Sequence, residues 1–193
     1  MLKICGITNR EDALAAIEGG ANALGLNFYP KSPRYVEPER AAEISAGLPH
    51  QVCKVGVFVD EPVANILRVA RTAGLDVAQL HGNESPEDYP AGMRIWKAVR
   101  VINGQAPLLD CPAEAVLLDG PASGQSFDWA LVTGSVERLI LAGGLDASNV
   151  RLAIQQVHPW GVDACSRLES SPGRKDHVKM ADFLKAAREA FAC

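Results

Sequence analysis

The sequence predicts a compact α/β protein, a single (β/α)₈ barrel domain spanning residues 1–193. Two observations indicate this fold: eight short apolar runs recur along the chain, and a stretch with helical spacing separates most of them. Alternating strands and helices favour a parallel sheet, because parallel strands need crossover connections and these are usually helical. Eight such units close most naturally into a barrel, and an open doubly wound sheet is the alternative fold.

The expected strands are short runs rich in β-branched and aliphatic residues. They cover residues 2–5, 23–28, 52–59, 77–80, 95–99, 115–118, 139–141 and 161–165. Eight units in 193 residues make a small example of the fold, slightly below its usual range of roughly 200 residues upward.

The expected helices have apolar residues at helical spacing, over residues 12–17, 38–44, 63–70 and 150–154, with a last helix opening at Asp176. Thr8 or Asn9 can cap the first helix and Asp146 the fourth, while Pro62 suits a first helical turn. The glycines at 19–20 can end the first helix.

The fifth unit departs from this pattern. Residues 101–112 contain Gly104, Pro107 and Pro112, which weaken or break a helix. We therefore expect the fifth helix to be short, irregular or absent.

Composition excludes several functional classes. A formal net charge of −4 argues against a protein that holds nucleic acid or an anionic membrane by bulk electrostatics. No apolar run approaches the roughly 18 residues needed to cross a bilayer, and the N-terminus lacks a secretory signal. We therefore expect a cytoplasmic protein.

The five cysteines are scattered and lack the paired short spacings of a structural zinc site. They stand at positions 5, 53, 111, 165 and 193. We expect free thiols in a reducing compartment and no bound metal.

Cys5 is the first candidate catalytic residue. In a (β/α)₈ barrel the working side chains lie at the C-terminal ends of the strands, and Cys5 ends the first strand. A free cysteine is more often a small core residue. Alternation, however, places Cys5 on the same side as Lys3, whose charge would favour a thiolate. A lysine inside the barrel also needs an anionic partner.

Asp119 is the second candidate, because it follows the apolar run 116–118 at the top of a buried strand. The alternative is that Asp119 has a structural role, as the cap of a turn or helix. Partial burial can keep such a carboxyl protonated often enough to serve as an acid at neutral pH. Cys5 and Asp119 together form a possible proton-transfer pair.

The remaining candidates are anion-binding groups. Arg34 lies in the long, proline-stiffened loop 27–36, where a guanidinium could clamp a carboxylate or phosphate, although a surface arginine is an equal alternative. Gly143 and Gly144 follow a strand and fit a phosphate cradle assisted by the next helix, although a tight turn is commoner. Ser166 and Arg167 lie in the next loop, and barrels often place phosphate between these two loops.

Seven strings, in order along nearly the whole chain, resemble the phosphoribosylanthranilate isomerases of tryptophan biosynthesis. They are Lys3-Ile4-Cys5-Gly6-Ile7-Thr8, Phe28 with Ser32-Pro33-Arg34-Tyr35-Val36, Gln79-Leu80-His81-Gly82, Leu117-Leu118-Asp119-Gly120, Ser126-Phe127-Asp128-Trp129, Leu141-Ala142-Gly143-Gly144-Leu145, and Val162-Asp163 with Glu169-Ser170-Ser171-Pro172-Gly173-Arg174-Lys175-Asp176. Their shared order is more specific than any single string.

The resemblance implies an Amadori rearrangement of a small phosphorylated substrate without a cofactor. Asp119 would act as the acid, Cys5 as the base, and Arg34 would hold the anthranilate carboxylate. It also implies that phosphate binds at the loops after the last two strands, and that His81 and Asp163 line the site. We expect a monomer or a homodimer.

One departure from the family pattern stands in the last loop, where Arg167 replaces a usual glycine. If this position requires a positive φ, the arginine is strained; alternatively, it contacts the phosphate or folds outward. The loop 122–125 also replaces a stretch that is usually richer in glycine and commonly carries a lysine.

Two rival functions remain. The related histidine-pathway isomerase uses an aspartate where this chain has Cys5 and shows twofold internal symmetry, and neither feature is present. A catalytically inactive, phosphate-binding barrel with a regulatory or assembly role is the second rival. Arg167 is the one feature that favours it, whereas Cys5, Arg34 and Asp119 together oppose it.

Overall fold

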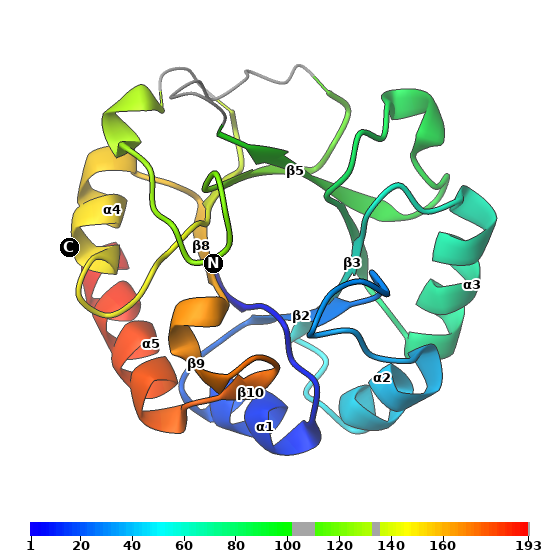
Figure 1. Cartoon of the computed structure of the whole chain (residues 1–193), viewed down its shortest axis with the longest axis horizontal. Helices are drawn as coiled ribbons and strands as arrows, with labels where there is room; N and C mark the ends of the chain where they lie inside the picture. The colour runs from blue at the N-terminus through cyan, green and yellow to red at the C-terminus, as the bar shows by residue number, and fades with distance from the viewer. Residues whose placement is uncertain (102–110, 133–135, 193) are drawn as a thin grey trace.

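In the computed structural model of the chain, which describes residues 1–101, 111–132 and 136–192, eight parallel strands form a closed barrel. Each strand pairs with the next along the chain, and the last pairs with the first (Figure 1). The strands are β1 Leu2–Ile4, β2 Ala23–Asn27, β3 Cys53–Phe58, β4 Val77–Leu80, β5 Arg94–Arg100, β6 Ala115–Asp119, β7 Leu139–Leu141 and β8 Gly161–Ala164. The predicted barrel and all eight predicted strands are confirmed, with small shifts at their ends.

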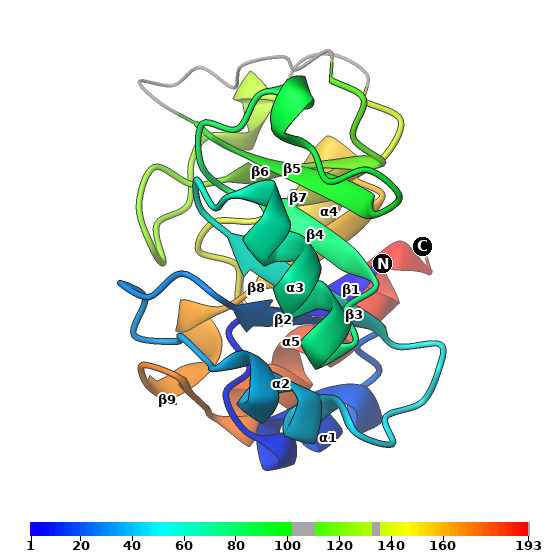
Figure 2. The same ribbon diagram turned by 90° about the vertical axis from the view of Figure 1, so that its right-hand side faces the viewer.

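Five α-helices lie around the outside of the barrel in the part of the chain that the structure describes (Figures 1 and 2). They are α1 Arg10–Glu18, α2 Pro38–Ser45, α3 Val63–Ala73, α4 Val150–Val157 and α5 His177–Phe191. Short 3₁₀ helices occur at η1 Pro86–Asp88, η2 Trp129–Leu131 and η3 Ser166–Leu168. Beyond β8, the short strands β9 Glu169–Ser171 and β10 Arg174–Lys175 form an antiparallel hairpin.

The helix caps settle one open alternative, at α1, and correct two predictions, at α3 and α4. Asn9, rather than Thr8, caps α1, because its side chain accepts a hydrogen bond from the Asp12 amide. Pro62 stands one residue before the first turn of α3 instead of inside it. Asp146 does not cap α4: its carboxylate accepts from the Ser148 amide, which forms a separate turn before the helix.

The other helix ends follow the sequence more closely. Gly19 ends α1, and the carboxylate of Asp176 accepts hydrogen bonds from two amides in the first turn of α5. For the predicted irregular segment 101–112, residues 102–110 lie outside the described part of the chain.

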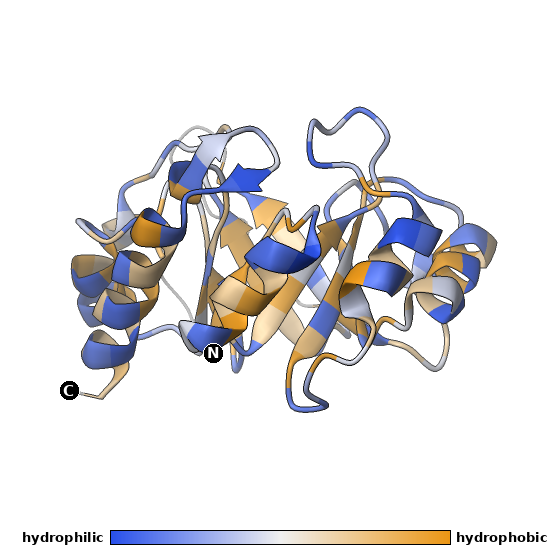
Figure 3. Ribbon diagram, turned by 90° about the horizontal axis from the view of Figure 1, so that it is seen from below, coloured by the Kyte–Doolittle hydropathy of each residue, from blue (hydrophilic) through white to orange (hydrophobic). Residues whose placement is uncertain are grey.

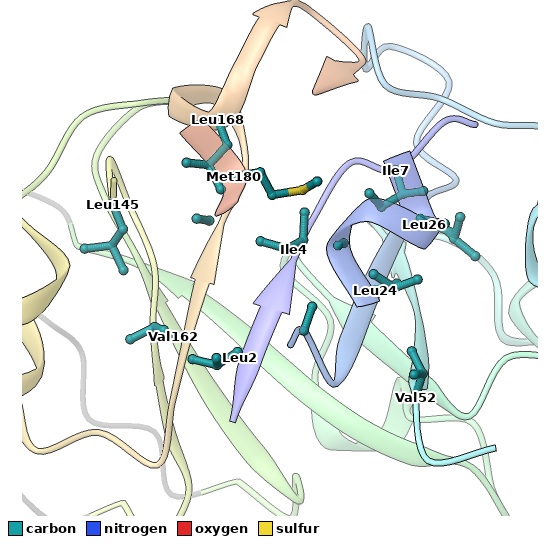
Figure 4. Packing of buried hydrophobic residues seen from close by; sticks show 14 of the residues in the cluster. Leu2, Ile4, Ile7, Leu24, Leu26, Val52, Leu145, Val162, Leu168 and Met180 are labelled. Carbon is teal, nitrogen blue, oxygen red and sulfur yellow. The ribbon is translucent and has the colours of Figure 1, made fainter. Parts of the chain in front are cut away.

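Alternation along the strands separates two hydrophobic layers. Leu2 and Ile4 of β1 point outward and pack with residues of the neighbouring strands and of α5, including Met180 (Figure 4). In Figure 3 the helices accordingly turn hydrophobic residues toward the strands and hydrophilic ones outward. A second cluster fills the lower barrel interior around the fully buried Trp96. Because this layer closes the barrel floor, a ligand can enter only at the other end.

No helix in the described ranges has the length and hydropathy needed to cross a bilayer.

Candidate active site

A cavity of about 860 Å³ opens at the C-terminal ends of the barrel strands. All nine side chains and glycines predicted as site residues line it. They are Cys5, Arg34, His81, Asp119, Gly143, Gly144, Asp163, Ser166 and Arg167. The closed barrel brings them together because every parallel strand delivers its last residues to the same rim.

Lys3 and Asp163 form a buried ion pair beneath the cavity. The Lys3 Nζ lies 2.9 Å from Oδ2 of Asp163, and the two residues are register partners on β1 and β8. Lys3 is fully buried, and Asp163 exposes only 7% of its surface. The anionic partner that the sequence required for Lys3 is therefore Asp163.

Cys5 completes this cluster, one step above the ion pair on the same inner face of β1. A hydrogen bond with Cys165 and the positive charges of Lys3 and Lys175 lower the pKa of the Cys5 thiol well below its usual range, although burial opposes this. Burial also opposes the charge of Lys3, but Asp163 and Cys5 together raise its pKa. The Lys3 ammonium is therefore the fixed charge of the cluster, and Cys5 is set up to be a thiolate.

Asp163 competes with Cys5 for the same ammonium. Burial, together with the charges of Cys5 and Asp119, raises the pKa of Asp163 to about 7 despite the attraction of Lys3. A carboxyl whose pKa is higher in the folded state than in the unfolded chain stabilises the fold at low pH. This contribution is lost as the pH rises through about 7.

Replacing Lys3 by methionine should destabilise the fold by about 3–5 kcal/mol, because it leaves the Asp163 charge buried without a partner. Without the ammonium, the pKa of Asp163 rises further, so the loss should be smaller at about pH 5 than at about pH 8. Urea unfolding of wild type and variant at both pH values measures this difference. The double variant Lys3→Met/Asp163→Asn should recover much of the stability, whereas an equal loss at both pH values would contradict the prediction.

Asp119 and His81 face each other across the cavity rim at the ends of β6 and β4. The His81 Nε2 lies 3.5 Å from Oδ2 of Asp119, and the other carboxylate oxygen accepts from the Gly120 amide. About a quarter of the Asp119 side chain is exposed, which leaves it within reach of a ligand. The predicted acid is therefore held by the Gly120 amide, lies close to His81, and is open toward the cavity.

Arg34 is held in place by Glu169, a residue of the β9–β10 hairpin. Its Nε and Nη2 donate to the two carboxylate oxygens at 2.8 and 2.7 Å, and Lys175 lies 3.1 Å from the same carboxylate. Burial opposes the charge of Glu169, but Arg34 and Lys175 lower its pKa. Gly6 makes room for this packing, since its φ is +72° and a Cβ there would lie 2.6 Å from Arg34 Cδ.

Gly143 and Gly144 adopt positive φ angles of 88° and 62°. A Cβ at either position would meet the backbone of the loop after β6, at 2.3 Å from the Gly120 amide and 2.6 Å from the Ser126 amide respectively. Two loops can therefore pack closely at this side of the cavity. The helix expected to assist them begins only at Val150, with a turn between.

Arg167 lies in η3 and has no positive φ; among the described non-glycine residues only Asp60 and His158 do. The strain considered for this arginine is therefore absent. Its Nε lies 3.4 Å from the Gly144 carbonyl oxygen and 3.5 Å from a carboxylate oxygen of Asp146, and 48% of its side chain is exposed. Arg167 thus bridges the last two loops at the cavity rim.

Three buried polar atoms of the cavity lining have no hydrogen-bond partner among the described residues. They are Oε1 of Gln79, Nε2 of His81 and Oδ1 of Asp163. Buried polar groups are nearly always satisfied in native proteins, so these atoms are available to ordered water or to a polar ligand. No three His, Cys, Asp or Glu side chains in the described ranges are grouped to hold a metal ion.

The sequence placed Gln79 and Cys165 at strand ends but gave neither of them a role. Gln79 points inward from β4, and alternation from Asp163 places Cys165 beside Cys5. Lys97 and Glu84 form a second buried ion pair at 2.6 Å that supports the loop after β4. No local pattern signals that pair, because it joins a strand to a preceding loop.

Comparison with known proteins completes the description of the site. The family model of N-(5'-phosphoribosyl)anthranilate (PRA) isomerase matches residues 2–186. The isomerase of that name from Solibacter usitatus is 55% identical over 198 aligned positions, which cover 98% of each chain.

Solved structures give the same relationship. The crystal structure of a phosphoribosyl anthranilate isomerase in complex with reduced 1-(o-carboxyphenylamino)-1-deoxyribulose 5-phosphate is 41% identical, with a TM-score of 0.86 over 97% of this chain and 98% of that one. A structure of monomers generated from the dimeric phosphoribosylanthranilate isomerase of Thermotoga maritima is 42% identical, again with a TM-score of 0.86 and the same coverage.

Proposed function

The chain belongs to the N-(5'-phosphoribosyl)anthranilate isomerase family of tryptophan biosynthesis, and from this membership we propose that Cys5 and Asp119 are its catalytic base and acid. The reaction is the Amadori rearrangement of N-(5'-phosphoribosyl)anthranilate to 1-(2-carboxyphenylamino)-1-deoxyribulose 5-phosphate. It is an internal redox change in which C1 of the sugar is reduced as C2 is oxidised. Because only protons move between enzyme and substrate, we propose that no cofactor takes part.

The first step is opening of the furanose ring. Asp119 donates a proton to the ring oxygen, the bond from that oxygen to C1 breaks, and the anilino nitrogen forms a Schiff base with C1. The partly exposed position of Asp119 at the rim supports this role, and His81 lies 3.5 Å from its carboxylate.

The second step is proton abstraction. The Cys5 thiolate takes the proton from C2, and the electron pair moves through C1 to the iminium nitrogen to give an enolamine. Tautomerisation of the enolamine then gives the ketone at C2. Lys3 supports this step because its buried charge keeps the thiolate populated.

The substrate's two anionic groups are proposed to bind at separate places on the rim. Arg34 would hold the anthranilate carboxylate, since its Nη1 forms no hydrogen bond with the described residues while Glu169 fixes the other nitrogens. Phosphate would bind at Gly143, Gly144, Ser166 and Arg167, where the last two βα loops meet. His81 and Asp163 would face the sugar between them.

The observation that carries this assignment is the pairing of a thiol activated by buried Lys3 with an accessible carboxyl in one cavity. Such a pair serves acid–base chemistry, whereas an inactive binding barrel needs neither group. We further propose that residues 1–193 form one catalytic domain, acting in the cytoplasm as a monomer or homodimer. The described Thermotoga maritima relative is dimeric. We propose that the ligand of this chain is the small phosphorylated substrate, and not nucleic acid or a membrane.

Turnover of freshly prepared N-(5'-phosphoribosyl)anthranilate tests the function. We expect the wild-type chain to convert this substrate catalytically to the carboxyphenylamino deoxyribulose phosphate, which is measured as loss of the substrate's fluorescence. Tight binding of a reduced product analogue without turnover would instead support the inactive, ligand-binding barrel. Reaction at the spontaneous rate, with no binding, would contradict both.

A further inference from the structure

Cys5 and Cys165 are neighbours on adjacent strand ends. The register of β1 and β8 pairs Lys3 with Asp163 and Ile4 with Ala164, and the Cys5 amide donates to the Ala164 carbonyl oxygen at 2.9 Å. Alternation then turns both sulfurs toward the barrel interior, where each thiol shifts the pKa of the other. These are the only cysteines in the described ranges that the barrel places side by side.

The backbone spacing suits a disulfide. Neighbouring strands lie about 4.8 Å apart, and disulfides join Cα atoms roughly 4.4–6.8 Å apart. Register partners at the ends of neighbouring strands therefore lie within the range of Cα separations that a disulfide can span. A bond at this place would hold the sulfur of Cys5 away from any substrate.

Both thiols border the cavity, so a small oxidant can reach them. Cys5 exposes 9% of its surface. Lys175 lies 3.8 Å from the Cys165 sulfur, and Lys3 lies below Cys5. A buried thiolate between ammonium groups is the form that hydroperoxides oxidise.

We propose that Cys5 and Cys165 form a reversible disulfide that switches the enzyme off in the presence of hydroperoxides. The loss of turnover rests on the proposed role of Cys5 as the base, whereas formation of the disulfide does not. A lone active-site thiolate would instead be driven on to the irreversible sulfinic acid. While the enzyme is inactive, the bond to Cys165 thus protects Cys5 from irreversible oxidation.

The chemistry has two steps that balance. The Cys5 thiolate attacks the outer oxygen of a hydroperoxide, and the O–O bond breaks to give Cys5 sulfenic acid and an alkoxide, or hydroxide from hydrogen peroxide. The alkoxide or hydroxide takes a proton from water and leaves as an alcohol or as water. The Cys165 thiolate then attacks the Cys5 sulfur, the S–O bond breaks, and the expelled hydroxide takes a proton from solvent and leaves as water. In the first step the Cys5 sulfur loses two electrons to the hydroperoxide. The second step needs no further oxidant or reductant.

The second step requires Cys165 to lose its proton once Cys5 has been oxidised. In the reduced site the hydrogen bond with Cys5 and burial raise the pKa of Cys165, against the charges of Lys175 and Arg34. Oxidation removes the negative charge of Cys5, and with it the hydrogen bond to a thiolate and the repulsion that raise the pKa of Cys165, while burial still opposes the Cys165 thiolate. The two cations then favour the Cys165 thiolate at the moment it is needed.

Peptide mapping after brief treatment with hydrogen peroxide tests the disulfide directly. Cys5 and Cys165 fall in separate tryptic peptides, residues 4–10 and 152–167, each with one cysteine. We expect these peptides to be linked, with the loss of two hydrogen atoms. Turnover should fall in proportion to the linked fraction, and dithiothreitol should restore both. Untreated wild type is assayed first, so that a failure of the proposed function is seen before any oxidation.

Two variants make the test specific. Cys165→Ser should form no linked peptide and, relative to its own untreated rate, should lose turnover irreversibly as Cys5 gains oxygen atoms. Cys53→Ser, at the opposite end of the barrel, should behave like wild type. Peroxide inactivation of wild type without the 4–10/152–167 link would overturn the proposal. Full turnover by protein in which the Cys5–Cys165 disulfide has formed would also overturn the proposal.

Discussion

Replacing Cys5 by serine is expected to lower kcat by about 10²- to 10⁴-fold, the range that a positioned general base contributes. A serine hydroxyl occupies almost the same space but stays protonated at neutral pH, so the base is lost while the cavity is kept. Since Arg34 and the phosphate loops are untouched, KM should change little. Steady-state loss of substrate fluorescence measures both constants.

Cys53→Ser is the matched control for this variant, because it removes a half-buried thiol at the start of β3, outside the cavity lining. It should turn over at the wild-type rate. Undiminished turnover by Cys5→Ser would show that another group takes the C2 proton. Asp163, also at the cavity floor, would be the next residue to examine.

The sequence predicted the barrel well because its signals are local. Each of the eight apolar runs needs only neighbouring residues to be recognised, and alternation within β1 was enough to place Cys5 with Lys3 on the inner face. The nine predicted site residues reached one cavity for the same reason. They lie at the C-terminal ends of strands or in the loops that follow, and a closed barrel gathers all of these ends at one rim.

Contacts between distant segments were harder to predict. Glu169 stood in a recognised string, yet nothing near it indicated that its carboxylate would hold Arg34, which lies 135 residues away. Positions 143 and 144 must likewise be glycine because a Cβ there would meet the backbone of the loop after β6. No spacing rule in the sequence reveals this contact. Arg167 was considered as a strained replacement for glycine, but its backbone adopts a short 3₁₀ turn instead.

Asp119→Asn should reduce kcat by a similar factor of about 10²- to 10⁴-fold, since an amide of the same shape cannot donate the proton that opens the ring. The hydrogen bond from the Gly120 amide to the side-chain oxygen can be retained, so the fold and substrate binding should persist. Asp128→Asn is the matched control, because Asp128 follows the same strand but lies outside the cavity lining and only caps η2. Wild-type turnover by Asp119→Asn would remove its assignment as the acid.

A substrate carrying deuterium at C2 distinguishes the roles of the two catalytic groups, which the rates alone cannot do. In Cys5→Ser the C2–H bond breaks in the slowed step, so a primary isotope effect on kcat should be fully expressed. In Asp119→Asn ring opening becomes limiting before C2 reacts, and the isotope effect should be suppressed. The reverse pattern would exchange the assignments. Asp119 lies at the rim, 3.5 Å from His81, whereas Cys5 is buried beside Lys3 at the cavity floor. These positions favour Asp119 as the acid that opens the ring and Cys5 as the base that takes the C2 proton.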